Sequence, residues 1–285
     1  NDVRRAYYDV LAADAQLAVF RELRDLSVRV RDTAETRFTA GDVPRLEVLQ
    51  AELALAASDN DATTTEGTLT AARTRLNALL GQPLATVQTL STALEAGAPV
   101  SLDAALNLAR TKNAELAVLD LRMDEQRARI TLAQAMRTPD LTPTATLTHD
   151  AQPDFSFGWR AGLGITVPLF TTHTAGVLVE QTTLDQLVTA RQAAAARITG
   201  EVTAAAAIAE AERLAYVRYR DVILPQAQQV EQVAQDSYQL GQTGIAALLQ
   251  ALQASRDIRL RTLDAMAQLQ MALADLEQAI GAPLP

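Results

Sequence analysis

The 285-residue sequence predicts a mainly α protein of long antiparallel coiled-coil helical hairpins with a small β-hairpin between them. Three observations predict this class. The sequence has 55 alanines but only 12 glycines and 10 prolines, which favours long helices in close contact because alanine is the best helix former. Residues 142–167 alternate with a period of two, which is typical of β-strands. The two ends of the chain also repeat each other at a fixed offset of 200 residues.

Charge and composition exclude several functions. The net charge of −9 argues against binding of nucleic acid, because proteins that bind nucleic acid obtain most of their affinity from a basic face. The chain has no cysteine, which excludes thiolate catalysis and cysteine metal sites. His149 and His173 have no ligand cluster nearby, and no paired carboxylates or nucleophile–base arrangement emerges. The sequence therefore predicts no enzyme, no cofactor and no metal site.

The first helical hairpin is bounded by glycine and proline. Residues 1–38 contain neither, so they predict one helix. Gly41 suits a helix C-terminus, Asp42 an N-cap and Pro44 an early position in the next helix. That helix runs to about Leu80, although the polar tract 58–68 has poor helix propensity. Its apolar residues keep the spacing of a coiled-coil seam at Leu46, Leu49, Leu53 and Ala56.

The middle of the chain changes from helix to strand. A short helix is expected from Leu102 and a longer one over 113–136. Two strands follow, over 142–149 and 157–167. In the second strand one face is continuously apolar and the other is small or polar, over the length that a strand needs to cross a bilayer. The residues expected to face lipid are Phe157, Trp159, Leu163, Ile165 and Val167.

The second hairpin begins with an unusually long helix. Residues 174–240 would span roughly 100 Å at the α-helical rise, and Pro225 is expected to kink this helix or change its packing. Gly241 and Gly244 end it, and the last helix runs to about Ile280.

The repeat relates these two hairpins. Between residues 38–84 and 238–284, 11 of 47 positions are identical without a gap. Gly41 pairs with Gly241, and Gly81 pairs with Gly281. The second copy has about 100 residues before its hairpin that the first copy lacks, so we expect that the chain is a fragment of a longer protein.

Short runs in a fixed order carry a resemblance to a known family. They are Arg37–Gly41, Leu79–Gly81, Ser101–Leu106, Ile165–Phe170 and Ser237–Gly241. Together with the repeat, they resemble the TolC-like outer membrane efflux proteins, the outer membrane factors of tripartite efflux systems. The run Leu46–Glu52 looks closest to the metal-cation branch of this family.

The resemblance implies a fold and a location. Three protomers would form a tube in the outer membrane of a Gram-negative-type bacterium, with most of the chain in the periplasm. Each protomer of such a homotrimer gives four strands to a twelve-stranded transmembrane β-barrel. This chain holds two of the four strands expected of one protomer. The implied segments are a tunnel hairpin (1–81), an equatorial segment (82–137), the barrel strands (138–170) and the second tunnel part (171–285).

The resemblance also implies partners and site residues. The hairpin tips would dock a periplasmic adaptor (membrane fusion protein) that connects to an inner-membrane pump, and the strands would contact outer-membrane lipid. Gate positions correspond to Glu47 and Tyr238. The tip arginine and the two acidic ring positions of the family are replaced by Thr243, Ala247 and Gln250. The predicted docking residues are Ala40, Gly41, Asp42, Leu240, Gly241 and Gln242.

Simpler interpretations stay open at this point. The tip glycines can serve only as helix caps, Glu47 as a solvated charge, and Tyr238 as a packing residue between helices. Phe157 and Trp159 can form the core of a small soluble sheet. The alternative function is a soluble periplasmic coiled-coil adaptor or scaffold, although adaptors usually place one hairpin between β-rich domains.

Overall fold

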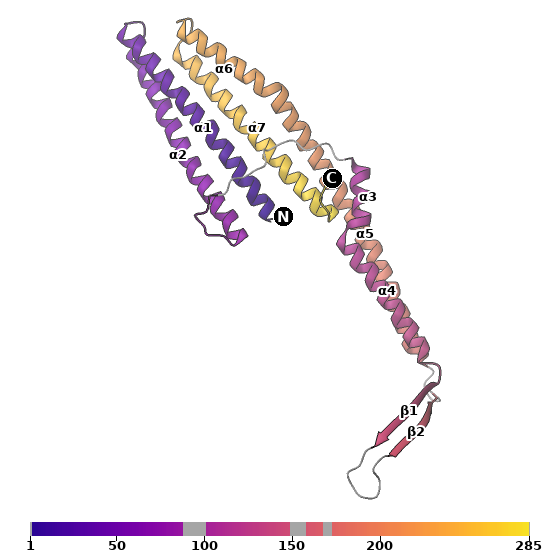
Figure 1. Cartoon of the computed structure of the whole chain (residues 1–285). Helices are drawn as coiled ribbons and strands as arrows, with labels where there is room; N and C mark the ends of the chain where they lie inside the picture. Colours follow the sequence, from indigo (N-terminus) through magenta and orange to yellow (C-terminus); the bar gives the residue numbers. More distant parts are fainter. Residues whose placement is uncertain (1, 88–100, 149–157, 168–172, 285) are drawn as a thin grey trace. The chain divides into compact units, whose positions relative to one another are not determined.

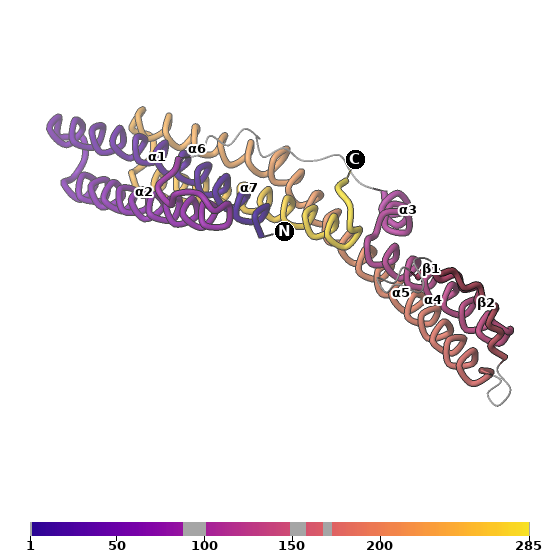
Figure 2. The backbone as a smooth tube through the Cα atoms, turned by 60° about the horizontal axis from the view of Figure 1, so that its bottom comes forward, coloured from indigo at the N-terminus to yellow at the C-terminus, as the bar shows by residue number. Residues whose placement is uncertain are grey.

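A computed structural model describes residues 2–87, 101–148, 158–167 and 173–284. It divides into two compact units, residues 1–109 with 201–285 and residues 110–200, which are considered separately. Within the described ranges, none of the helices is long and apolar enough to cross a membrane. The elements (Figures 1 and 2) are α1 (Asp2–Thr39), α2 (Arg45–Leu80), α3 (Leu102–Lys112), α4 (Ala114–Ala135), β1 (Asp140–Thr148), β2 (Gly158–Thr166), α5 (Thr174–Arg218), the π-helix η1 (Tyr219–Ile223), α6 (Leu224–Gln239) and α7 (Ile245–Ile280).

The larger unit contains two helical hairpins, α1–α2 and α6–α7, which lie side by side with α7 against α1 (Figures 1 and 2). Their turns lie at the same end, where side chains from all four helices form one buried cluster. We call this cluster the tip core. Its buried members are Leu26, Val30, Ala34, Val48, Ala51, Tyr238, Ile245, Leu248 and Leu252.

Both hairpin turns close with the same backbone motif. Gly41 and Gly241 have φ angles of +84° and +72°. The N–H of Gly41 donates to the carbonyl of Phe38, and the N–H of Asp42 donates to the carbonyl of Arg37. The turn at Gly241 repeats this pattern, which is the Schellman motif. The 200-residue repeat is therefore a repeat of backbone conformation as well as of sequence.

The predicted cap of α2 is wrong. The residue at the N-cap position is Pro44, and no side chain caps this helix end. Asp42 lies too early, because its backbone N–H still closes the preceding helix. The backbone N–H groups of Gly41 and Asp42 thus belong to the Schellman turn, and the next helix begins later than the N-cap preference of aspartate indicates.

Two glycine substitutions should have opposite effects on stability, one through backbone conformation and the other through helix propensity. We expect Gly41→Ala to lower the free energy of unfolding by about 1–2 kcal/mol, because an L-residue is strained at positive φ. Open space surrounds Gly41, so no steric clash adds to this cost. Gly67 lies inside α2 and is also unobstructed, so Gly67→Ala should stabilise the protein by about 0.5–1 kcal/mol. Guanidinium unfolding followed by circular dichroism measures both. Equal effects of the two substitutions would contradict the assignment.

The polar tract of α2 is helical throughout, despite its poor propensity. Threonine hydroxyls there donate to the carbonyl four residues earlier, as Thr63 does to Asp59 and Thr65 to Asp61. The Ser58 hydroxyl oxygen also lies 3.0 Å from the hydroxyl oxygen of Ser27 in α1, within hydrogen-bond distance. Contact with α1 therefore outweighs intrinsic propensity, as tertiary packing often does.

The long second helix is interrupted before Pro225. Five residues, Tyr219–Ile223, form a π-helix, and α6 begins directly after them. Proline has no N–H, and its ring clashes with the carbonyl of the residue four positions earlier, here Asp221. A wider π turn moves that carbonyl away, so the expected change at Pro225 takes the form of a π-bulge.

The smaller unit holds α4, the first part of α5 and the β-hairpin. The side chain of Asn113 caps α4 by accepting from the backbone N–H groups of Glu115 and Leu116. Arg191 of α5 donates through two of its guanidinium nitrogens to the two carboxylate oxygens of Asp120 of α4, which lowers the pKa of the carboxyl group. β1 and β2 form an antiparallel two-stranded sheet.

Candidate functional site

The two hairpin tips bring the predicted gate residues together. Glu47 lies in the first turn of α2, and Tyr238 lies in the last turn of α6. These residues are 191 positions apart, yet the Tyr238 hydroxyl donates to a Glu47 carboxylate oxygen at 3.2 Å. The structure thus places them in contact, and their role as a gate stays a prediction.

Arg37 completes this contact from α1. Its guanidinium donates to the backbone carbonyl of Tyr238 at 2.9 Å and lies 4.8 Å from the centre of the Tyr238 ring. That geometry combines a charge-assisted hydrogen bond with a cation–π contact. We call Arg37, Glu47 and Tyr238 the tip clasp. It joins the two hairpins, because two members belong to the first and one to the second.

Sequence reasoning missed the part that Arg37 plays. The run Arg37–Gly41 indicated a hairpin tip, but its arginine was not a candidate site residue. Thr243 replaces the arginine that the family resemblance implies at the second tip. The structure supplies a guanidinium from the opposite hairpin instead, and a basic residue in the last turn of α1 was the available signal.

Tyr238 is buried in the tip core and is 1% exposed. This burial and, after it, the nearby Glu47 carboxylate raise the pKa of its hydroxyl to about 12, while Arg37 acts in the opposite direction. The neutral phenol is therefore the form that the folded tip favours.

The tip clasp should make stability depend on alkaline pH. An unfolded tyrosine loses its proton near pH 10, whereas folded Tyr238 retains it up to about pH 12. The contribution of Tyr238 is thus complete below pH 10 and is lost as the pH rises towards 12. We expect Tyr238→Phe to lower the free energy of unfolding by about 1 kcal/mol at pH 8 and to flatten its decline above pH 10. Urea unfolding at pH 8, 10 and 11 tests this, and an unchanged slope would contradict it.

The predicted docking residues lie on the surface of the tips. All six, which comprise Ala40, Gly41, Asp42, Leu240, Gly241 and Gln242, are exposed. Leu240, next to Gly241 in the second turn, is 72% exposed. The apices of the two turns are thus exposed in the described structure. Adaptor docking at these turns stays a prediction.

A buried polar network links the hairpins further from the tips. Glu231 of α6 is 7% exposed and accepts from Ser255 of α7, from Arg259 at 3.0 Å and from Gln235 at 3.3 Å. Arg259 also lies 2.9 Å from Glu22 of α1. A buried carboxylate needs such partners because desolvation disfavours its charge. No local pattern in the sequence predicts this network, because its members come from three helices.

The β-hairpin has one apolar face that extends across both strands. Residues directly opposite each other in an antiparallel pair share a face, and Leu163 lies opposite Pro143 while Trp159 lies opposite Leu147. The other face consists mainly of threonine and glycine, with Arg160 opposite Thr146 and Asp140 opposite Thr166. It is tight at one point, because a Cβ on Gly162 would lie 2.9 Å from the Thr144 hydroxyl.

The apolar face is uncovered in the described structure. Trp159 is 75% exposed, Leu163 68%, Ile165 61% and Val167 47%, and Leu147 of β1 is 72% exposed. Phe157 lies outside the described residues. A two-stranded sheet with an exposed apolar face is only marginally stable in water. We therefore expect lipid or other strands to cover this face. Contact with lipid stays a prediction.

Metal ligands do not gather anywhere in the described ranges: no group of three or more histidine, aspartate or glutamate side chains could hold an ion there.

The class of protein follows from a family comparison. The model of a family described as "Outer membrane efflux protein" matches residues 1–82 and 105–282. The chain belongs to the outer membrane efflux protein family, and the resemblance seen in its sequence is confirmed. A comparison with curated protein sequences finds no match.

Solved structures show the same fold. A membrane protein from Pseudomonas aeruginosa is similar over 99% of this chain and 65% of its own, with a TM-score of 0.69 and 20% identity. The outer membrane protein VceC from Vibrio cholerae matches with a TM-score of 0.69 and 17% identity, over 99% of this chain and 69% of its own. The open state of the MtrE outer membrane channel of Neisseria gonorrhoeae matches with a TM-score of 0.65 and 19% identity, over 99% of this chain and 67% of its own.

These similarities confirm the predicted fold class of long helical hairpins with a small β-hairpin. The chain spans about two thirds of the length of the structures that it matches.

Proposed function

We propose that the chain is a subunit of the outer-membrane channel of a tripartite efflux system, a passive conduit across the periplasm and the outer membrane. The observation that carries this proposal is the family match, which covers both helical hairpins and the β-hairpin between them. In this function the protein performs no catalysis, and the energy for export comes from a partner pump.

The two kinds of structure in the chain suit the two parts of such a channel. The long hairpins would form the wall of a periplasmic tunnel, as segments 1–81 and 171–285, with 82–137 as an equatorial segment. Segment 138–170 would enter the outer membrane. Its support is the open apolar face of β1 and β2, which suits contact with lipid better than contact with water.

The protein would act as a homotrimer together with a periplasmic adaptor and an inner-membrane pump. Support for adaptor docking is the exposure of the two tip turns and of Leu240 in particular. Support for a gate at the same place is the contact of Glu47 with Tyr238, three copies of which would surround a narrow opening. A ring of Glu47 carboxylates would attract cations, in keeping with the likeness of Leu46–Glu52 to the metal-cation branch.

Electron microscopy of the detergent-solubilised protein, expressed from its complete reading frame, tests the proposal. We expect a threefold cylinder in end views and a tapered helical end in side views. Conductance in a planar bilayer provides an independent measurement. Thin rods without a ring, together with purification in the absence of detergent, would contradict the channel and support the alternative of a soluble coiled-coil adaptor or scaffold.

A further inference from the structure

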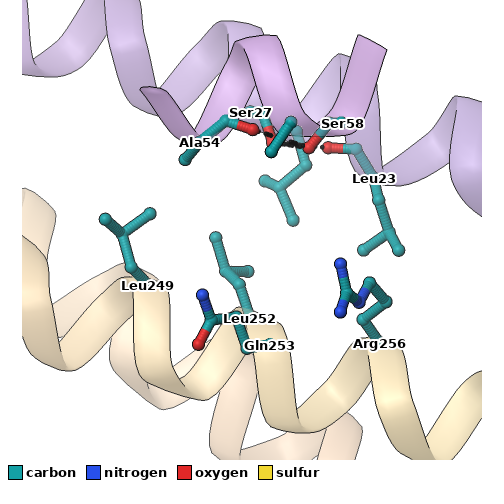
Figure 3. A pocket seen from close by; sticks show the side chains of 10 residues that line it. Leu23, Ser27, Ala54, Ser58, Leu249, Leu252, Gln253 and Arg256 are labelled. Carbon is teal, nitrogen blue, oxygen red and sulfur yellow. Dashed lines mark hydrogen bonds between the residues drawn. The ribbon is translucent and has the colours of Figure 1, made fainter. Parts of the chain in front are cut away.

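Two pockets of the larger unit are poor candidates for a ligand site. The pocket between α7 and the first hairpin (Figure 3) has a volume of about 80 Å³, which is below the ~150 Å³ that holds a benzene-sized molecule. A wider pocket of about 550 Å³ lies between α1, α2 and α7. Its polar groups already have partners, because Gln16 donates to Asp264 at 3.1 Å and Arg75 lies 3.9 Å from Asp9. A ligand there would have to replace contacts that the protein itself makes.

A third pocket lies in the smaller unit, where the end of α4 and the start of α5 meet the β-hairpin (Figure 1). Its volume is about 500 Å³, which is within the range of pockets that hold small ligands. We call it the junction pocket. Its apolar side is formed by Leu132, Ala135 and Met136, and its polar side by Asp140, Thr166 and His173.

The apolar side belongs to the last turns of α4. Leu132 and Met136 are four positions apart, so they lie on the same face of the helix. They are 58% and 55% exposed. Apolar side chains that line a hollow together with a few polar groups are typical of small-molecule sites. This side of the pocket therefore suits the apolar body of a ligand.

The polar side carries one carboxylate. Asp140 is the first residue of β1 and is exposed. Among the described residues its side chain has no ion-pair or hydrogen-bond partner, whereas Asp120 of the same unit is paired with Arg191. The residues that line the pocket include no lysine or arginine. An anion would thus meet only a like charge, and a cation would find a carboxylate that is free to accept a charge-assisted hydrogen bond or to form an ion pair.

His173 closes the pocket at the start of α5. Its φ angle is +47°, and no other non-glycine residue in the described ranges has a positive φ. The carbonyl of His173 accepts from the N–H of Val177 at 3.2 Å, so this residue begins the helix. Residues in sparsely populated backbone conformations persist where the surrounding structure holds them, and they cluster at ligand sites.

We propose that the junction pocket binds a small organic cation, whose ammonium group pairs with Asp140 and whose apolar body lies against Leu132 and Met136. Asp140 and Thr166 are opposite each other on the threonine and glycine face of the β-hairpin. In a channel whose apolar strand face contacts lipid, the threonine and glycine face lines the lumen. The site then lies where the tunnel passes into the barrel, in the path of exported molecules. Only this placement in the lumen rests on the proposed function.

Binding is tested with three probes of similar size and different charge, which are benzyltrimethylammonium, benzyl alcohol and benzenesulfonate. Titration calorimetry uses the protein expressed from its complete reading frame, in detergent at pH 8, where histidine side chains are uncharged. Asp140→Asn removes the charge and Leu132→Gln alters the apolar side. The matched controls are Asp185→Asn on α5 and Leu121→Gln on α4, which are both exposed and do not line the pocket.

We expect benzyltrimethylammonium to bind at least tenfold more tightly than benzyl alcohol, and benzenesulfonate not to bind. Asp140→Asn should lower the affinity for the cation at least fivefold and Leu132→Gln at least threefold, whereas each control should stay within a factor of two. Equal affinities for the cation and the alcohol would overturn the proposal. It would also be overturned if the two pocket variants bound the cation as tightly as their controls.

The placement in the lumen is tested by conductance in a planar bilayer. Benzyltrimethylammonium should lower the mean current of the unmodified channel at least twofold, and Asp140→Asn should abolish this block. A current that stays unchanged at concentrations that saturate the site would overturn the placement. Failure to form any conducting trimer, combined with binding that depends on Asp140, would overturn the proposed function and support the site.

Discussion

Replacing Leu163 by arginine is expected to cost about 2–4 kcal/mol of folding free energy in a lipid bilayer, which is the range for an arginine at the midplane of a barrel strand. Leu163 lies near the middle of β2 and is 68% exposed on the apolar face. Its neighbours on that face, Ile165 and Trp159, are also exposed. A guanidinium at this depth would lose its hydration without gaining a partner, and that loss is the source of the cost.

The opposite face offers a matched control. Thr142 lies on the polar face, across from Gly164, and is exposed. Thr142→Arg should therefore change the folding free energy by less than about 1 kcal/mol, as substitutions that point away from lipid do. Urea titrations in phospholipid vesicles, followed by tryptophan fluorescence of Trp159, measure both variants. Equal stabilities of the two variants would show that the apolar face does not contact lipid.

Replacing Arg259 by leucine should cost about 3–5 kcal/mol, the range for a broken buried ion pair. The reason is the Glu231 carboxylate, which is 7% exposed and would keep only Ser255 and Gln235 as partners. The contact of Arg259 with Glu22 adds little, because the Glu22 side chain is 65% exposed. Guanidinium unfolding in detergent, followed by circular dichroism at 222 nm, gives the magnitude.

Two further variants separate the buried charge from lost packing. The double variant Glu231→Leu with Arg259→Leu removes both charges and should recover most of the lost stability, because apolar replacements of a buried pair are often neutral. Arg24→Leu breaks an exposed pair with Asp59 and should cost less than about 1 kcal/mol. A double variant no more stable than Arg259→Leu would mean that the network acts through shape and not through charge.

The sequence was most informative where a single local rule decides the structure. The glycines at 41, 81, 241 and 281 all adopt positive φ, which the repeat had marked as helix ends. The alternation in 142–167 is found as two paired strands with one apolar face. These features depend on a few neighbouring residues, so composition and period were sufficient to predict them.

Local rules were less reliable where two rules compete. Asp42 is a residue type that N-cap positions prefer, but its backbone N–H belongs to the Schellman turn at Gly41. The threonine-rich tract of α2 has low helix propensity, and contact with α1 overrides it. Pro225 predicted an interruption, but the form of that interruption, a π turn before the proline, depends on the surrounding helix.

The contacts between hairpins needed the tertiary structure. Arg37 and Tyr238 are 201 positions apart, and Glu22 and Arg259 are 237 positions apart, so no local period connects them. Arg37, Glu22 and Arg259 are charged residues of a type that usually lies on a helix surface. Only the packing of α7 against α1 decides that they become partners, and that packing depends on shape and burial over the whole hairpin.

The sequence by itself thus determined the helical hairpins, their turns, the apolar strand face and the membership of a family, because periodic patterns and glycine positions are properties of short segments. The tertiary structure decided which side chains join the two hairpins and which of these are buried. Those outcomes depend on how two long helical surfaces meet, and a shift of one residue along a helix turns each side chain by about 100°. For this reason both copies of the repeat have the same turn conformation, whereas the residues of the tip clasp have no identical counterparts at the offset of 200 residues.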